Sequence, residues 1–269
     1  MRAPEGAQWA QSIAMSHPSI AEINAGFAAR LRAGETLLGA IIALPCPEVA
    51  ELFSRAGFDW LFIDTEHAPL DALAAQGLLQ AARCPCLVRV AAGEEALIKK
   101  ALDIGAAGVV VPQVNSAADA ERIVRYCKYP PRGSRGVGIV RAQGYGLDFQ
   151  QYVASANDDV IVMLQIEHID AVRNIESIVR VPGVDALMIG PYDLAGTMGK
   201  LGRVNDPEVE QAIETVHRAC AAAGMKLGIF AATAGGMKPY IEKGYTLPIA
   251  GMDLMLLAAA ARGMVQALK

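Results

Sequence analysis

From Val160 to Ala195 the chain reads VIVMLQIEHIDAVRNIESIVRVPGVDALMIGPYDLA. An apolar strand that ends at Glu167 is followed by a helix and by a second apolar strand that runs into Gly190-Pro191-Tyr192-Asp193. Parallel strands joined by a crossover helix end on the same side of their sheet, so Glu167 and Asp193 are expected to face each other. Two carboxylates above an apolar floor need a cation or a proton to neutralise them. We therefore predict a cation site here.

The same pattern recurs along the chain. Four segments begin with a helix-ending glycine and continue into a short apolar strand: Gly57–Asp64, Gly105–Pro112, Gly183–Gly190 and Gly244–Gly251. Strands near positions of about 37, 58, 86, 108, 160, 186, 226 and 246 make eight in all, with helices or long loops between them. This predicts an α/β fold, a (β/α)8 TIM barrel with an additional N-terminal helix. An open doubly wound sheet is the alternative, but no GxGxxG follows the first strand.

Composition limits the classes of protein. With 53% hydrophobic and 19% charged residues in 269, the chain can bury one large core, so we expect a single barrel domain over residues 19–269 after a loose arm at 1–18. The net charge of -4 provides no basic surface for nucleic acid or an anionic membrane. Five scattered cysteines and the lack of a signal segment or a membrane-spanning run predict a cytoplasmic protein.

Polar residues gather at the downstream ends of the predicted strands, where TIM barrels carry their reactive groups. They are Asp64, Glu66 and His67, then Arg89, Gln113, Gln165, Glu167, Tyr192 and Asp193. Each has a structural alternative: His67 as a bonded loop histidine, Arg89 as an outward ion-pair partner, Asp193 as a helix cap, and Glu167 as a partner of Arg141. Their shared location favours a site.

Several segments together resemble the HpcH/HpaI aldolase family. They are GFDWLFIDTEHAPLD, the VRV around Arg89, GAAGVVVPQVNSAADAERIVRYCKYPPRGSRGVG, QIE and GPYDLA. The resemblance runs from about Ala33 almost to the C-terminus. It implies a metal-dependent (class II) pyruvate aldolase, such as 4-hydroxy-2-oxoheptanedioate aldolase. Such an enzyme reversibly cleaves a 4-hydroxy-2-oxo acid into pyruvate, or a close 2-oxo acid, and an aldehyde.

The resemblance also implies ligands for a metal ion and for pyruvate. Glu167 and Asp193 correspond to the protein ligands of a divalent metal, and their hard oxygens suit Mg2+ or Mn2+, with Co2+ as a third option. Gln165 lies two residues before Glu167 on the same strand face, near the metal or the substrate. The backbone N–H groups of Tyr192 and Asp193 are expected to bind the pyruvate carboxylate.

The catalytic residues implied by the resemblance come from the second and third strands. Arg89 is expected beside the 2-oxo oxygen of pyruvate, where negative charge develops. His67 is expected to act as the base, oriented by Asp64.

Two further expectations concern segments outside this set. The irregular stretch Lys128–Gly146 suits a loop over the mouth of the barrel. Within Gly138–Gly146, Arg141 is a candidate for binding a distal carboxylate of the substrate, with a solvated loop arginine as the alternative, and Tyr145 is a candidate for closing over the aldehyde. The last helix, Asp253–Leu268, is apolar nearly all round, which predicts oligomerisation. The resemblance implies a homohexamer, a trimer of dimers with exchanged C-terminal helices.

Other chemistries on this scaffold fit less well. None of the lysines stands at a downstream strand end, which argues against a Schiff base. The loop Ala231–Gly236 could cradle a phosphate, but Asp253 at the start of the last helix would repel it. A non-catalytic barrel that binds 2-oxo acids is the alternative from a different class. A thioester lyase is a further alternative, although the chain shows no basic patch for its coenzyme.

Overall fold

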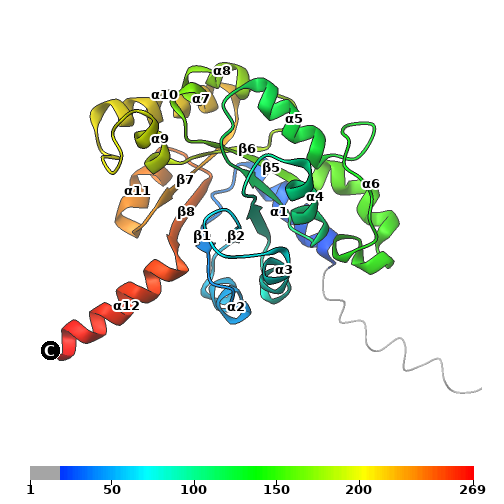
Figure 1. Ribbon diagram of the computed structural model, residues 1–269, viewed down its shortest axis with the longest axis horizontal. Helices are drawn as coiled ribbons and strands as arrows, with labels where there is room; N and C mark the ends of the chain where they lie inside the picture. The colour runs from blue at the N-terminus through cyan, green and yellow to red at the C-terminus, as the bar shows by residue number, and fades with distance from the viewer. Residues whose placement is uncertain (1–18) are drawn as a thin grey trace, which may run out of the picture.

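Eight parallel strands pair in chain order and close into a barrel, as the ribbon in Figure 1 shows for this computed structural model, which describes residues 19–269. The strands are β1 Gly39–Ile42, β2 Trp60–Asp64, β3 Cys86–Arg89, β4 Gly108–Val111, β5 Ile161–Ile166, β6 Ala186–Ile189, β7 Lys226–Ala231 and β8 Leu247–Met252. The predicted TIM barrel is confirmed. The arm expected at residues 1–18 lies outside the described residues.

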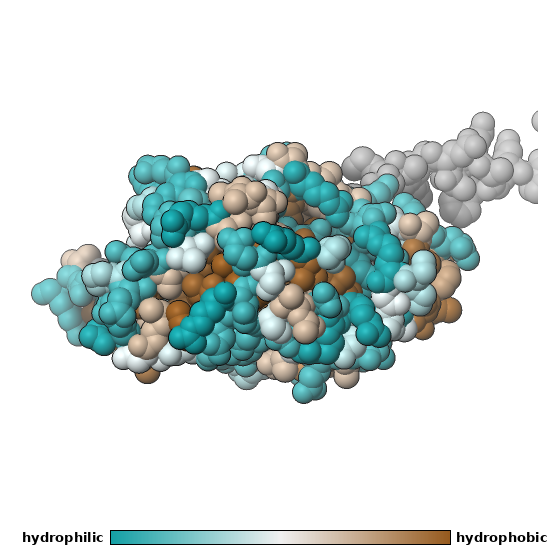
Figure 2. Space-filling model, turned by 90° about the horizontal axis from the view of Figure 1, so that it is seen from above, coloured by the Kyte–Doolittle hydropathy of each residue, from teal (hydrophilic) through white to brown (hydrophobic). Residues whose placement is uncertain are grey.

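Helices alternate with the strands and surround the barrel (Figure 1). They are α1 Ile20–Ala33, α2 Pro47–Ala56, α3 Ala72–Ala81, α4 Glu95–Asp103, α5 Ala117–Cys127, the 3-10 helix η2 Arg141–Gly146, α6 Phe149–Asp159, α7 Ile169–Arg173, α8 Ile175–Ile178, α9 Pro191–Thr197, α10 Pro207–Ala223, α11 Ala234–Glu242 and α12 Asp253–Leu268. Hydrophilic residues cover most of the face in Figure 2, with hydrophobic residues between them. This is the pattern expected of amphipathic helices packed on a barrel.

Side chains alternate between the inside and the outside of the barrel along each strand. On β2, Trp60 and Phe62 belong to the inner core, whereas Leu61 and Ile63 pack against the helices. Asp64 continues the inward series, because it follows Phe62 by two residues. The inner core therefore fixes which downstream residues point into the mouth of the barrel.

The helix α1 closes the upstream end of the barrel. Its residues Phe27, Ala28 and Leu31 join the inner core, and the Phe27 ring lies 6.3 Å from that of Trp60. A capping box between Ser19 and Glu22 begins this helix.

The stretch Lys128–Gly146 does not cover the mouth, so that prediction is wrong. The guanidinium of Arg141 donates to Ile104 O at 2.8 Å and to Leu79 O at 3.1 Å, at the C-terminal ends of α4 and α3. Helices of such a barrel run antiparallel to the strands, so these ends lie at the upstream face. The helix α5 has already carried the chain back to that face before the loop begins. Arg141 and Tyr145 therefore lie away from the mouth, and Arg141 is not the partner of Glu167.

The helix α12 extends away from the barrel, as Figure 1 shows. After Asp253 its residues are exposed, including Leu254, Leu257 and Val265. The exchange of this helix between subunits stays a prediction. Within residues 19–269, no helix has the length and apolar character needed to cross a bilayer.

Candidate functional site

A cavity of about 350 Å³ opens at the downstream end of the barrel. Its lining comes from the ends of several strands and from the first turn of α12: Ile41, Asp64, His67, Arg89, Gln165, Met188, Gly190, Pro191, Tyr192, Asp193, Phe230, Met252 and Met255. Six of the predicted site residues line it: Asp64, His67, Arg89, Gln165, Tyr192 and Asp193. Glu167 does not line it but contacts the lining residue Gln165. The predicted residues therefore come together.

Arg89 points into the barrel and is held by Asp64. Its Nε lies 2.9 Å from Asp64 Oδ1 and its Nη2 lies 2.8 Å from Oδ2, while the guanidinium stands 5.1 Å from the centre of the Phe62 ring. Burial raises the pKa of Asp64, but the hydrogen bonds and charge of Arg89 outweigh it, so this pKa lies below its ordinary value. The outward orientation of Arg89 is excluded.

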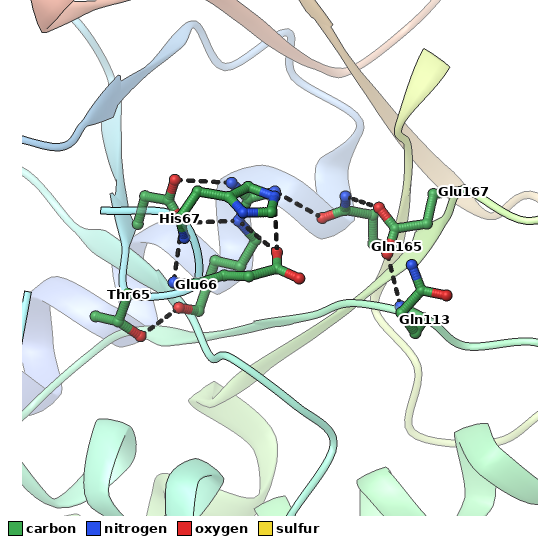
Figure 3. Close-up of polar contacts among 8 residues, drawn as sticks. Thr65, Glu66, His67, Gln113, Gln165 and Glu167 are labelled. Carbon is green, nitrogen blue, oxygen red and sulfur yellow. Dashed lines mark hydrogen bonds and ion pairs between the residues drawn. The ribbon is translucent and has the colours of Figure 1, made fainter. Parts of the chain in front are cut away.

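The predicted contact between Asp64 and the His67 imidazole is not found within residues 19–269. Asp64 Oδ1 instead accepts the backbone N–H groups of Glu66 at 3.1 Å and of His67 at 3.3 Å. The imidazole is 65% exposed, and its Nε2 lies 3.8 Å from Glu66 Oε2 (Figure 3). The reason is that the Asp64 carboxylate is already shared between Arg89 and the backbone of the turn.

Glu66 is a site residue for which no role was predicted. Its Oε2 is buried, lies 3.2 Å from Arg89 Nε, and has no hydrogen-bond partner of good geometry among the described residues. Burial raises the pKa of Glu66. The charges of Arg89 and His67 lower it and those of Asp64 and Asp193 raise it, and the net effect is a pKa above its ordinary value. The available signal was its place in the turn between Asp64 and His67.

Glu167 is buried at the end of β5, where each of its carboxylate oxygens accepts one hydrogen bond. Its Oε1 accepts the Gln113 backbone N–H at 2.8 Å, and its Oε2 accepts the Gln165 side-chain amide (Figure 3). Gln113 adopts a φ of 58°, a left-handed conformation that is uncommon outside glycine and that aims its N–H at the carboxylate. Burial raises the pKa of Glu167, and the charges of Glu66 and Asp193 add to this.

Gly190 lets β6 approach Glu167 closely. A Cβ at Gly190 would lie 2.9 Å from Glu167 Cβ and 3.1 Å from its Oε2, so only glycine fits without a shift. The helix α9 begins directly after it, with Gly190 at the N-cap and Asp193 exposed in the first turn. Asp193 is therefore not the cap residue. The N–H groups of Tyr192 and Asp193, in a first helical turn, have no acceptor within the helix.

The donors at this point fit a divalent cation. Glu167 and Asp193 carry hard carboxylate oxygens, and the mutual repulsion among Glu66, Glu167 and Asp193 is what a cation would relieve. Residues 19–269 contain no group of three or more His, Cys, Asp or Glu placed to hold a metal. A site with two protein ligands leaves its other positions to water and substrate, as Mg2+ prefers.

Comparison with known proteins shows the family of this chain. The family model described as HpcH/HpaI aldolase/citrate lyase matches residues 40–260. The hydroxypyruvate/pyruvate aldolase of Pseudomonas aeruginosa is 41% identical over 88% of this chain and 90% of its own length. The 2-dehydro-3,6-dideoxy-6-sulfogluconate aldolase of Pseudomonas putida is 39% identical over 86% of this chain and 92% of its own.

A solved structure extends the likeness to the fold. The HpcH/HpaI aldolase/citrate lyase family protein of Burkholderia cenocepacia superposes with a TM-score of 0.87 at 37% identity, covering 91% of this chain and 99% of that one. The matched region contains every strand of the barrel except the first residue of β1. This protein belongs to the HpcH/HpaI aldolase/citrate lyase family.

Proposed function

We propose that this protein is a pyruvate aldolase that reversibly cleaves a 4-hydroxy-2-oxo acid into pyruvate, or a close 2-oxo acid, and an aldehyde. The comparisons confirm the class of enzyme, a carbon–carbon lyase of the aldolase type. The observation that carries the proposal is that Arg89 and Gln165 line one cavity, with Gln165 bonded in turn to the buried Glu167. These residues offer a positive group and a cation site to one small 2-oxo acid.

Glu167 and Asp193 are the residues that would hold a divalent cation, Mg2+ or Mn2+, with Co2+ as a third option. When bound, such an ion would act as a Lewis acid toward the 2-oxo group of the substrate. Gln165 orients Glu167 by donating to its Oε2, and its own Oε1 stands 3.5 Å from Arg89 Nη1. Gln165 thus links the two charged parts of the site.

Arg89 and the first turn of α9 would bind the pyruvate unit. The guanidinium is pre-oriented by its two bonds to Asp64, so it stabilises negative charge that develops on the 2-oxo oxygen without rearranging. The backbone N–H groups of Tyr192 and Asp193 lie at a helix N-terminus, where a carboxylate is favoured. Binding and charge stabilisation are therefore assigned to different elements.

His67 would move the proton. Its imidazole reaches solvent and lies near Glu66, which supports a base that exchanges protons with water. In cleavage it takes the proton of the 4-hydroxyl group, the bond between C3 and C4 breaks, and the aldehyde leaves. The electron pair remains on the pyruvate fragment as its enolate, which is then protonated at C3.

The test is proton exchange at the methyl group of pyruvate, followed by NMR in heavy water with Mg2+ or Mn2+. The wild type is expected to exchange it, and Glu167→Gln is expected to lose exchange while remaining folded. Glu176→Gln, an exposed residue on α8, serves as the matched control. Binding of pyruvate without any exchange would overturn the proposal and favour a non-catalytic binder of 2-oxo acids.

Compartment and assembly belong to the same proposal. The five cysteines are all unpaired thiols, three of them buried, which supports a reducing compartment such as the cytoplasm. The exposed apolar side chains of α12 support a homo-oligomer, a hexamer built as a trimer of dimers.

A further inference from the structure

A second cavity lies at the upstream end of the barrel, opposite the mouth. It measures about 420 Å³ and is bounded by α1, by the end of α3, and by the chain that leads into β3 and β4. Its charged lining residues, Arg83 and Arg141, are both cationic, although the protein as a whole carries a net charge of -4. The charged side chains that line the cavity are therefore all positive, as an anion requires.

Arg141 is built into this cavity. A Cβ on Gly105, whose φ is +93°, would stand 2.4 Å from Arg141 Nη1, so the guanidinium depends on glycine at that position. Two backbone carbonyls, of Ile104 and Leu79, accept from it, and no carboxylate of the described residues is among its charged neighbours. Burial lowers the pKa of Arg141, as expected for a cation without an acidic partner.

Asn24 lines the same cavity and carries a donor without a partner among the described residues. It is only 4% exposed and belongs to the face of α1 that carries Phe27 and Leu31 into the core. Its Nδ2 is buried and has no hydrogen-bond partner among residues 19–269. A buried polar group without a partner destabilises a fold unless water or a ligand satisfies it. An acceptor atom is what this position lacks.

We propose that the upstream cavity is a binding site for a small organic anion, which it holds by a carboxylate or phosphate group. Arg141 supplies the inner charge, Asn24 donates a hydrogen bond, and Ile20, Ile23 and Pro85 pack against the carbon part of the ligand. Arg83 lies at the rim, where its side chain is 67% exposed and already pairs with Glu51 at 2.8 Å.

This site is separate from the mouth of the barrel. The two cavities share no lining residue. An anion here would join α1 to the C-terminal ends of α3 and α4, so it would stabilise the fold rather than enter the reaction. The inference therefore does not depend on the aldolase proposal.

The test is isothermal titration of the full chain, without added metal, with inorganic phosphate and separately with succinate, each against chloride at equal ionic strength. Saturable binding of one equivalent of phosphate, succinate or both is expected, with a matching rise in Tm; the response identifies the preferred group. Asn24→Leu and Arg141→Gln are expected to weaken binding at least tenfold. Asn24→Leu keeps a side chain of similar size, so it tests the donor even if Arg141→Gln disturbs the loop.

Arg89→Gln, which changes the other end of the barrel, is expected to bind as the wild type does. No saturable binding of either probe would overturn the proposal. Binding that survives both Asn24→Leu and Arg141→Gln, or that disappears in Arg89→Gln, would also overturn it, the last by assigning the anion to the mouth.

Discussion

Arg89 combines burial, charge and fixed orientation in one side chain. Its guanidinium donates two hydrogen bonds to the Asp64 carboxylate, and its Nη1 faces Gln165. Lysine keeps the charge but cannot reproduce this geometry. Arg89→Lys is expected to slow methyl proton exchange in pyruvate by about 100- to 1000-fold, the usual loss for a donor that stabilises developing charge. Exposed Arg122→Lys is the matched control, and exchange within threefold of wild type in Arg89→Lys would contradict the role.

The Glu167 carboxyl is expected to destabilise the protein when no metal is bound. Its pKa is raised by burial and by the charges of Glu66 and Asp193. A carboxyl with a raised folded-state pKa destabilises fully above that pKa, and the penalty vanishes below the pKa of the unfolded chain. Glu167→Gln should therefore raise Tm at pH 7 to 8 by a few degrees, at about 2 to 4 °C per kcal/mol. Below about pH 4 the wild type and Glu167→Gln should have the same Tm.

A divalent metal should make the wild type melt at a higher temperature than Glu167→Gln. A ligand that binds only the native state raises Tm, so Mn2+ is expected to stabilise the wild type and not Glu167→Gln. Thermal unfolding across pH, with and without Mn2+, measures both effects. The assignment of Glu167 as a metal ligand fails if Mn2+ raises the Tm of both proteins equally.

Among the elements, the loop between α5 and α6 is anchored by one buried side chain. Arg135 bonds Asp103 at 3.0 Å and the Tyr152 hydroxyl at 3.1 Å, and it lies 4.5 Å from the centre of the Tyr129 ring. Arg135→Lys is expected to cost about 2 to 4 kcal/mol in urea unfolding, because lysine cannot both stack and bond in this way. Turnover per folded molecule should not change, since the loop lies away from the mouth. Arg132→Lys, in an exposed pair, is the control.

The elements themselves were predictable from the sequence, whereas the position of this loop was not. Glycines such as Gly57 and Gly183, each followed by an apolar run, identify strands because local sequence determines a helix end and a buried strand. The composition of Lys128–Gly146 identifies the segment as irregular but not the end of the barrel at which it lies. The direction of α5 determines that end, because a helix that follows a strand returns the chain to the upstream face.

The site was predictable in its location and only partly in its contacts. Strand ends converge in any such barrel, so grouping Arg89 with Gln165 followed from the fold. The partner of Asp64 did not follow from the fold. Both Arg89 and His67 could bind this one carboxylate, and only the distances in the structure show that the Arg89 guanidinium does. No role was predicted for Glu66, because its proximity to Arg89 arises from the turn after β2 and not from the spacing of residues along a strand.

At the scale of the whole molecule, α12 begins at the site and continues as an exposed helix. Asp253 holds its first turn by accepting the backbone N–H groups of Ala43 and Leu44, each at 2.9 Å, and Met255 lines the mouth. Beyond that turn, Leu257 and Val265 are 62% and 50% exposed on a helix that projects from the barrel. Apolar side chains so exposed on a projecting helix are typical of a surface that another subunit covers.

The wild type is therefore expected to sediment as an oligomer, and Leu257→Glu combined with Val265→Glu to shift it toward the monomer, because buried glutamates without partners are costly at an interface. Since Met255 belongs to the same helix, KM for the 2-oxo acid should rise more than kcat falls. Sedimentation velocity and steady-state kinetics on the same samples measure both. Gln266→Glu places a charge nearly opposite Leu257 on the helix and should leave both unchanged. A wild type that sediments as a monomer at all concentrations would instead mean that α12 is exposed in solution and contacts the site only through Met255.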